Sequence, residues 1–454
     1  MPKKYTLNTW AITMINIIAI DNLRSPAFSA KFGTHLIGYY FLAAVLFFLP
    51  VCLICAELAS RYPEKGGIYV WIKRGLGKEI AFFTIWIQWI YNVIWFPSLM
   101  IFVWAILTHM LDSPFLYHPV VTLVGMVSIF WLCTLFNCYG MQVSSRISTI
   151  GVIIGTLIPM TIICVLAFFD PPNIGFQITM SDFIPDFTAN NETFPYFVEL
   201  IFGLVGIEIS AAHADEVKNP SSTYPKATFI SIIIILATLI FSGLAIAKMV
   251  PTEQLSVLSG IMQAAKIFFT NNHMTWFYPI FGCMVMIGSL SCLTTWIIGI
   301  TKGIFVASQD RFLPDFLSKE NQYKAPYIIL IIQALIFTLL STSILLLPIE
   351  VAFVLLTAVT TQLSLLIYII LFITAYCLKH HRPNTQYFKT PYLGLVCTIG
   401  GLTSIGVFII GFFIPLELGY HSPLFYSLII CCILILAMLP PVLGIVHSRR
   451  YAEE

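Results

Sequence analysis

The sequence predicts an all-α protein that crosses a lipid bilayer many times, and three observations support this class. Hydrophobic residues make up 59% of the 454 residues, whereas charged residues make up only 10%. A soluble domain carries about 25% charged residues, so this deficit is typical of a membrane protein. The mean hydropathy is +0.91, and apolar runs long enough to span a bilayer recur along the whole chain.

Twelve membrane spans are expected when each crossing takes about 20 apolar residues. The runs cover residues 8–30, 36–58, 80–109, 119–140, 148–169, 195–217, 227–249, 275–306, 326–347, 351–378, 392–414 and 424–446. No stretch between them is long enough to form a separate soluble domain. We therefore expect residues 1–454 to form a single transmembrane domain.

Lysine and arginine predict the orientation of the spans. If both termini lie on one side, that side holds 19 of the 23 basic residues, and the positive-inside rule makes it the cytoplasm. An odd number of spans would place the two termini on opposite sides and mix the basic-rich loops with the others, which favours twelve. The expected location is a bacterial-type inner (plasma) membrane, with the lipid bilayer as surroundings and both termini in the cytoplasm.

The composition also argues against several functions. The net charge of +2 comes from basic residues dispersed among short loops, so no nucleic-acid partner is expected. The eleven cysteines show no metal-binding spacing and no disulfide framework, so neither a metal nor another cofactor is expected. An enzyme is disfavoured because no nucleophile–base spacing is present.

The span at 8–30 is interrupted by polar residues. Within eleven residues it holds Asn16, Asp21, Asn22, Arg24 and Pro26. Charged residues at membrane depth cost about 2.5–3.5 kcal/mol each on insertion scales, and proline removes a backbone donor. We therefore expect a broken helix here. The alternative is that Asp21, Asn22 and Arg24 mark the outer helix end, with Arg24 paired to Asp21.

The span at 195–217 is interrupted by two glycines and an acid, Gly203, Gly206 and Glu208. The glycines allow the backbone to open. A buried glutamate beside them is suited to carrying a proton, because an intramembrane carboxyl changes its charge when its surroundings change. The alternative is that Glu208 is a structural carboxyl, hydrogen-bonded to a neighbouring helix.

The positions of the two interrupted spans predict an inverted repeat. A first five-helix unit at 8–169 would be followed by a second, inverted unit at 195–378 and by two extra helices at 392–446. Transporters commonly place their substrate site between two such broken helices. The helix ends at the breaks would offer N–H groups to a carboxylate and carbonyls to an ammonium group, which suits a zwitterion.

Three motifs resemble those of amino acid–polyamine–organocation (APC) transporters. They are ELASRYPEKGGIYVW at 57–71, GLVGIEISAAHADEVKNPSSTYPKA at 203–227 and TTWIIGITKGIFVASQDRFLPDFLSKENQYKAP at 294–326. Within this superfamily the chain is most similar to the bacterial glutamate/γ-aminobutyrate antiporters. The resemblance implies a LeuT-type fold and the exchange of an amino acid, such as glutamate, against a related amino acid or amine.

The resemblance also implies roles for single residues. Glu208 matches a glutamate of span six that is tied to proton sensing or substrate contact, Trp296 matches a tryptophan that lines the substrate path, and Phe202 falls near an aromatic gate. The Gly-Ser-Gly of the first broken helix is replaced by IAIDNLRSP at 18–26. The tyrosine expected in span ten falls at Leu363 or Ser364, with Tyr368 one turn further on.

The predicted substrate-binding residues are Asp21, Asn22, Arg24, Phe202, Gly203, Gly206, Glu208 and Trp296, with Glu208 also coupling a proton. Trp296 has an alternative role in packing the bundle. Gln88, Asn92 and Trp95 share one face of span three and are expected to form helix–helix hydrogen bonds.

Exchange is the expected mode of transport, and an H⁺- or Na⁺-coupled amino acid symporter is the alternative. Thr294 and Thr295 could supply hydroxyls to a sodium ion, although hydroxyls in membrane helices usually bond to the carbonyls of their own helix. A receptor or scaffold that binds amino acids without moving them rarely needs charged residues at mid-bilayer.

Overall fold

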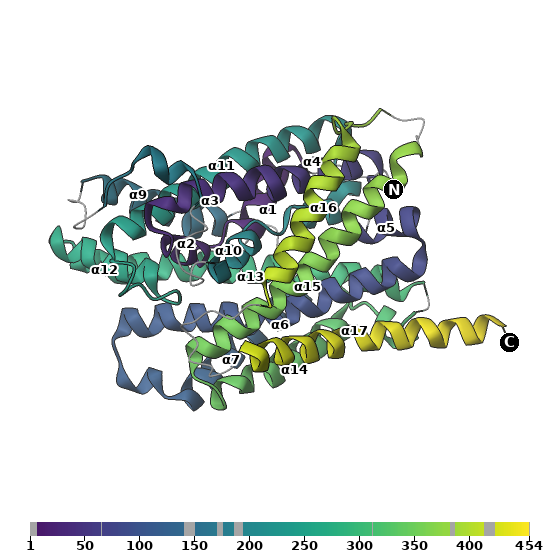
Figure 1. The fold of residues 1–454 in the computed structure, drawn as a ribbon. Helices are drawn as coiled ribbons and strands as arrows, with labels where there is room; N and C mark the ends of the chain where they lie inside the picture. Colours follow the sequence, from purple (N-terminus) through teal and green to yellow (C-terminus); the bar gives the residue numbers. More distant parts are fainter. Residues whose placement is uncertain are drawn as a thin grey trace.

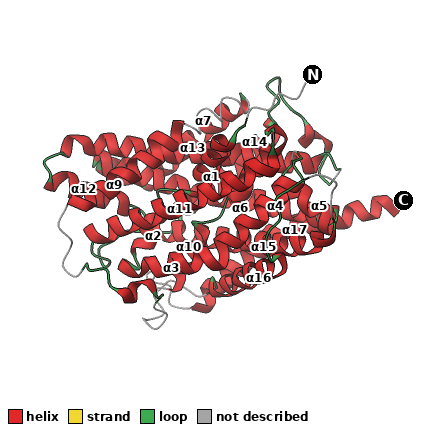
Figure 2. Ribbon diagram, turned by 90° about the horizontal axis from the view of Figure 1, so that it is seen from above, coloured by secondary structure: helices red, strands yellow, loops and turns green. Residues whose placement is uncertain are grey.

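The computed structural model describes residues 7–64, 66–139, 150–169, 176–185, 194–310, 312–381, 386–412 and 423–453. In these residues the regular secondary structure is helical, apart from one isolated bridge between Leu7 and Val217. The longer helices run side by side along one direction of the molecule (Figures 1 and 2). The predicted all-α class is therefore confirmed.

The α-helices are α1 (Thr9–Ile20), α2 (Ser25–Ala30), α3 (Leu36–Ala43), α4 (Leu49–Arg61), α5 (Ile68–Leu76), α6 (Lys78–Leu111), α7 (Pro119–Cys138), α9 (Ile158–Phe169), α10 (Phe194–Phe202), α11 (Pro220–Met249), α12 (Gly260–Asn271), α13 (Tyr278–Ser308), α14 (Tyr327–Ser341), α15 (Ile349–Cys377), α16 (Leu393–Ile410) and α17 (Pro423–Glu453). Two π-helical segments, Ala44–Phe48 and Ile153–Leu157, join α3 to α4 and precede α9.

Short 3₁₀ helices complete the described secondary structure. They are η1 (Gly33–His35), η3 (Pro114–Tyr117), η5 (Met180–Phe183), η6 (Ile207–Glu216), η7 (Thr275–Phe277), η8 (Asp315–Ser318), η9 (Thr342–Leu345) and η10 (Leu378–His380).

Ten helical segments among the described residues are long and apolar enough to cross a membrane. They are Gly33–Arg61, Lys78–Leu111, Pro119–Cys138, Ile150–Phe169, Pro220–Met249, Thr275–Ser308, Tyr327–Leu345, Ile349–His380, Leu393–Ile410 and Leu424–Val446. Each coincides with one of the twelve predicted spans. The other two predicted spans are the interrupted ones, at 8–30 and 195–217.

Both interruptions are present in the structure. Helix α1 ends at Ile20, and α2 begins five residues later at Ser25, with Pro26 in its first turn, where a missing N–H costs nothing. Helix α10 ends at Phe202, and the chain resumes as η6 at Ile207. Gly206 has φ +131°, a conformation that side chains other than glycine's rarely adopt. Asp21 therefore caps the end of α1, and a second helical segment follows it, as expected of a broken helix.

Two helices were not predicted, because both lie between spans. Helix α5 follows Gly66 and Gly67, whose φ angles of +120° and +49° turn the chain sharply. Gly67 also approaches η6 closely, since a Cβ there would lie 3.2 Å from the carbonyl carbon of Ala211. This glycine pair thus turns the chain and lets it approach η6 closely. Helix α12 lies between α11 and α13.

Helix α6 forms the centre of the bundle and packs against both α13 and α15. Helix α5 and the C-terminal end of α17 lie at one end of the molecule, and α12 lies at the other (Figures 1 and 2). The amide of Leu7 donates to the carbonyl of Glu216 over 3.3 Å, so the first described residue contacts the end of η6.

Candidate functional site

A small cavity of about 30 Å³ lies where the two broken helices meet α6 and α13, with room for a few water molecules in this conformation. Its lining residues are Ala19, Ile20, Asn22, Arg24, Ser25, Tyr91, Asn92, Trp95, Phe202, Gly203, Val205 and Trp296. All of them except the half-buried Phe202 are buried. Five predicted site residues are thus brought together here: Asn22, Arg24, Phe202, Gly203 and Trp296.

The two breaks pack directly against each other. A Cβ on Gly203 would lie 3.0 Å from Ser25 Oγ, and a Cβ on Gly206 would lie 3.1 Å from the carbonyl oxygen of Ala19. That oxygen, at the end of α1, accepts a hydrogen bond from Trp296 Nε1 over 3.1 Å. The indole therefore satisfies a helix-end carbonyl and forms a wall of the cavity. Its expected packing role thus coexists with a position in the cavity wall.

Arg24 lies in the first break and is only 3% exposed. Its Nη1 donates to Ser98 Oγ over 2.9 Å and to Thr357 Oγ1 over 3.2 Å. The aromatic rings of Phe28, Trp95, Phe202 and Phe353 surround the guanidinium, with centroids 5.2–5.9 Å from Cζ. The expected alternative pairing with Asp21 is not found, because Asp21 accepts from Thr238 instead.

Arg24 has no ion-pair partner among the described residues, and Glu199 on α10 is the acidic residue whose charge acts on it. Glu199 is buried, and its Oε2 has no hydrogen-bond partner. A buried guanidinium held only by hydroxyls and rings is incompletely compensated, so it is suited to receive an anionic group.

Three polar atoms of cavity-lining side chains have no hydrogen-bond partner. They are Arg24 Nε and Trp95 Nε1, which are donors, and Asn92 Oδ1, which is an acceptor. Buried polar groups are normally paired, so unpaired ones in a cavity indicate where a ligand binds. The donors suit a carboxylate, and the acceptor suits an ammonium group.

Glu208 lies outside the lining of this cavity. Its Oε2 accepts from the hydroxyl of Tyr368 over 2.6 Å, and its Oε1 accepts from Gln88 Nε2 over 3.3 Å. The amide of Gly206 in turn donates to the oxygen of Tyr368 over 3.1 Å. These bonds join the second break to α15 and α6. They agree with the structural alternative for Glu208 without removing its capacity to take a proton.

A second cavity lies against Glu208, on the side of α5. Its lining residues are Gly66, Gly67, Ile68, Ile85, Gln88, Glu208, Ile209, Ala212, Gly299, Lys302 and Gly303. Gln88 therefore makes the expected helix–helix hydrogen bond, whereas Asn92 and Trp95, one and two turns further along the same helix, face the first cavity. The shared face of span three thus contributes to both cavities.

The remaining predicted residues do not line either cavity. Asp21 and Gly206 are absent from the lining of both cavities. Thr294 and Thr295 donate to the carbonyl oxygen of Ser291 in their own helix over 2.9 Å and 2.8 Å, as hydroxyls in membrane helices usually do.

The N–H groups at the start of α2 were expected to face a carboxylate, but several of them are already paired. Those of Arg24 and Ser25 donate to Asn22, and that of Ala27 donates to the carbonyl of Arg24. The Asn22 side chain and the local turn thus take the place of a ligand. The guanidinium of Arg24 and the indole of Trp95 are the donors that remain for an anion.

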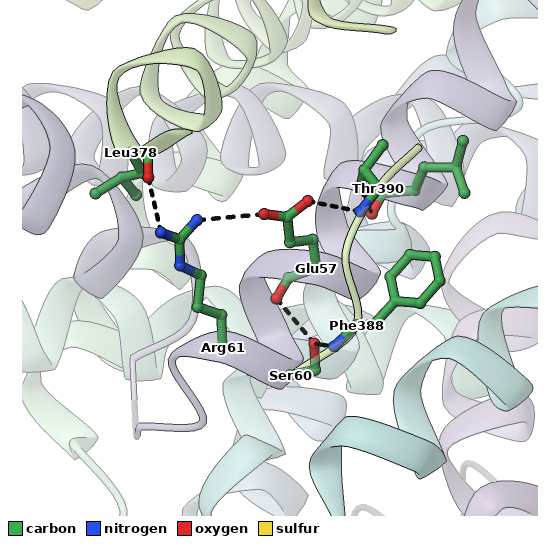
Figure 3. Close-up of polar contacts among 7 residues, drawn as sticks. Glu57, Ser60, Arg61, Leu378, Phe388 and Thr390 are labelled. Atoms are coloured by element: carbon green, nitrogen blue, oxygen red, sulfur yellow. Dashed lines mark hydrogen bonds and ion pairs between the residues drawn. The ribbon is translucent and has the colours of Figure 1, made fainter. Parts of the chain in front are cut away.

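A buried polar cluster lies at the C-terminal end of α4 (Figure 3). Glu57 and Arg61, one turn apart on α4, form an ion pair of 3.2 Å. Arg61 Nη2 also donates to the carbonyl of Leu378 over 2.7 Å, and the amide of Thr390 donates to Glu57 Oε2 over 2.9 Å. The cluster therefore ties α4 to the end of α15 and to the segment that leads into α16.

A neighbouring surface cluster joins α5 to the loop after α13. Asp310 accepts from Tyr69 and Lys73. Burial raises the pKa of Asp310, but the hydrogen bonds and the charges of Lys73 and Lys78 outweigh it and hold that pKa below its usual value. Asp310 is therefore ionised at neutral pH and fastens α5 to α13.

We expect Arg61→Ala to destabilise the protein by about 3–5 kcal/mol, since it leaves Glu57 as an unpaired buried charge. Arg74→Ala is the matched control, because the Arg74–Glu64 pair is 40% and 50% exposed and is expected to contribute about 0–1 kcal/mol. Thermal unfolding in detergent should show a much lower midpoint for Arg61→Ala alone. Equal midpoints for the two variants would contradict a structural role for the cluster.

A helical membrane bundle with two broken helices around a polar cavity is the architecture of a transporter. Comparison with known proteins identifies its family: the model of the amino acid permease family matches residues 6–437, and the chain belongs to that family. The family is part of the APC superfamily, so the resemblance seen in the sequence is confirmed. The protein is therefore an integral membrane transporter.

Three proteins similar to this chain are described as transporters or antiporters. An uncharacterised transporter of Legionella pneumophila is 39% identical over 99% of both chains. A glutamate/γ-aminobutyrate antiporter of Lactococcus lactis subsp. lactis is 28% identical over 94% of this chain and 87% of its own. Another, from L. lactis subsp. cremoris, is 31% identical over 69% of this chain and 63% of its own.

Sequence reasoning did not place four of these residues at the site: Tyr91, Asn92, Trp95 and Tyr368. Tyr91 lines the cavity and lies edge-on to Trp296, and Tyr368 holds Glu208. Asn92 and Trp95 were assigned to helix packing, although their amide and indole are polar groups in an apolar span. That polarity was the available signal, since a buried amide or indole normally has a partner.

Proposed function

We propose that this protein is an antiporter that exchanges an acidic amino acid, such as glutamate, against a related amino acid or its decarboxylated amine by alternating access. The observation that carries the proposal is the set of unpaired atoms around the cavity: donors at Arg24 and Trp95, and an acceptor at Asn92. An α-carboxylate, an α-ammonium group and a second carboxylate match these atoms. The names of the Lactococcus relatives support the same substrate class.

The architecture that we propose has twelve spans. The ten continuous spans and the two broken ones would form a LeuT-type five-plus-five inverted repeat, at 8–169 and 195–378, followed by two helices at 392–446. Both termini would lie in the cytoplasm. Leu7 contacts Glu216, and α5, which carries the basic residues Lys73 and Arg74, lies at the same end of the molecule as the C-terminal end of α17 (Figure 1); both observations support this orientation.

A counterflow experiment with the purified protein in proteoliposomes tests the proposed function. Liposomes are loaded with one unlabelled amino acid or amine, and uptake of labelled glutamate is followed. We expect uptake only when glutamate, a related amino acid or the decarboxylated amine is inside. Uptake into empty liposomes that is driven by a sodium or proton gradient would support the symporter instead. Absence of transport for every amino acid would leave only a receptor or scaffold role.

Glu208→Gln is expected to flatten the pH dependence of exchange, while glutamate binding changes little. The reason is that Glu208 lies in the second cavity, held by Tyr368 and Gln88, and does not line the first one. Gln keeps the shape of the side chain and removes its titration. Exchange rates between mildly acidic and alkaline pH provide the measurement. A pH profile equal to that of the wild type would show that Glu208 has only a structural role.

A further inference from the structure

Asp21 is a buried carboxyl that the cavity does not use. It caps the C-terminus of α1 at the first break, is 1% exposed, and is absent from the cavity lining. We propose that Asp21 is a proton-binding site of the transport cycle, occupied by a proton in the conformation described here. The proposal rests on the proposed exchange function and deepens it, because it names a group that carries a proton with the substrate.

The contact between Asp21 and Thr238 is best satisfied by a protonated carboxyl. Thr238 Oγ1 lies 2.7 Å from Asp21 Oδ2, 2.8 Å from the carbonyl oxygen of Ile234 and 3.0 Å from that of Ile235. A hydroxyl has only one hydrogen to share among these three oxygens. If Asp21 carries a proton and donates it to Thr238, the hydroxyl is free to donate to its own helix, and both short contacts are hydrogen bonds.

Apart from Thr238, the described surroundings of Asp21 offer little that would compensate a negative charge. Among the described residues no basic side chain forms an ion pair with it, and its Oδ1 has no hydrogen-bond partner. The titratable groups that act on it from neighbouring helices are Tyr40 on α3, Cys164 on α9 and Cys292 on α13. Phenols and thiols are ordinarily neutral at neutral pH. A buried carboxylate without a partner is strongly disfavoured, so the neutral acid is expected.

The dipoles at the helix ends also favour a neutral Asp21, and they distinguish Asp21 from Glu208. Asp21 caps the C-terminus of α1, where the helix dipole is negative and opposes a carboxylate. Glu208 lies in the first turn of η6, where the dipole is positive, and each of its oxygens accepts a hydrogen bond. The geometry therefore suits a neutral Asp21, whereas both oxygens of Glu208 have hydrogen-bond donors.

The position of Asp21 also explains how its proton could be coupled to transport. It lies between the break of α1, whose next residue Asn22 lines the cavity, and α11, which packs along α1. Movement of the broken helix past α11 would separate Asp21 from Thr238 and admit water to the carboxyl. The proton is then released on the side to which the site opens, and it is taken up again before the break closes.

Proton movement during exchange is the first test. Proteoliposomes containing the full chain and a trapped pH-sensitive dye are followed during glutamate exchange against its decarboxylated amine. Asp21→Asn, which imitates the neutral acid, is expected to retain exchange and to move about one proton fewer per substrate. Glu253→Gln, an exposed carboxyl before α12, is the control and should match the wild type. An unchanged proton count in Asp21→Asn would overturn the proposal, as would a sodium requirement that Asp21→Asn removes.

Infrared difference spectroscopy is the second test and does not depend on transport. The wild type is expected to show a carboxylic-acid band near neutral pH that Asp21→Asn removes, Asp21→Glu shifts and Glu208→Gln retains. If Asp21→Asn does not fold, the shift in Asp21→Glu decides the assignment. A spectrum without such a band, or one whose band survives Asp21→Asn, would overturn the proposal. Loss of all amino acid exchange in the wild type with this band present would instead refute the proposed function alone.

Discussion

Arg24→Ala is expected to reduce the exchange of glutamate roughly 10- to 100-fold, while a neutral amino acid is affected less. Hydrogen bonds to charged groups contribute about 1.5–3 kcal/mol, and each 1.4 kcal/mol is a factor of about ten in affinity. Arg24 is the buried cation of the cavity, and its Nε is unpaired. The loss should therefore appear mainly as weaker binding of the anionic substrate, measured by counterflow at several glutamate concentrations.

Two further variants separate charge from structure at this position. Arg24→Lys keeps the charge but loses the planar fork, which also packs among four aromatic rings, so an intermediate loss is expected. Arg24→Ala combined with Glu199→Gln removes both buried charges. It should recover any lost stability without recovering glutamate exchange. Equal glutamate transport by Arg24→Ala and the wild type would refute an acidic substrate bound at Arg24.

The breaks in the two helices could be predicted because their signals are local. Asp21, Arg24 and Pro26 in an apolar run, and the glycines before Glu208, each oppose a regular membrane helix on their own. The structure has both breaks at these residues. What the sequence could not show is which side chains at a break point into the cavity. Asp21 and Arg24 lie three residues apart, yet one contacts α11 and the other lines the site.

The contribution of α6 to the cavity could not be predicted for a different reason. This helix is buried on almost every face, from Ala81 to Thr108, so its sequence has no apolar stripe that reveals its orientation. Tyr91, Asn92 and Trp95 become cavity residues only through the rotation of α6 against the two breaks. That rotation depends on tertiary packing with α13 and α15.

Tyr368 illustrates the limit of placing residues by resemblance. The expected tyrosine of span ten was assigned to position 363 or 364, and the residue that contacts Glu208 lies one helical turn further on. Residues 364 and 368 lie four apart and share a helix face, so Tyr368 contacts Glu208 from one turn further along the span. A continuous apolar span such as α15 contains no local landmark that fixes its depth against another helix.

Gly206→Ala is expected to lower exchange at least about 10-fold, because three contacts of the site depend on this glycine. Its φ of +131° is strained for alanine, at a cost of roughly 1–2 kcal/mol. The added Cβ would lie 3.0 Å from Trp296 Cζ2 and 3.1 Å from the carbonyl oxygen of Ala19, and would thus press on the bond between these two residues. The Gly206 amide also donates to Tyr368, which holds Glu208.

Gly406→Ala is the matched control for this substitution. Gly406 lies within α16, and a Cβ there would meet nothing within 4 Å, so alanine should be tolerated or should stabilise the helix by up to about 1 kcal/mol. Size-exclusion profiles separate lost folding from lost transport. If Gly206→Ala folds and exchanges glutamate at the wild-type rate, then the two breaks do not need their close contact. Opening of the cavity would then not depend on the hydrogen bond between Trp296 and Ala19.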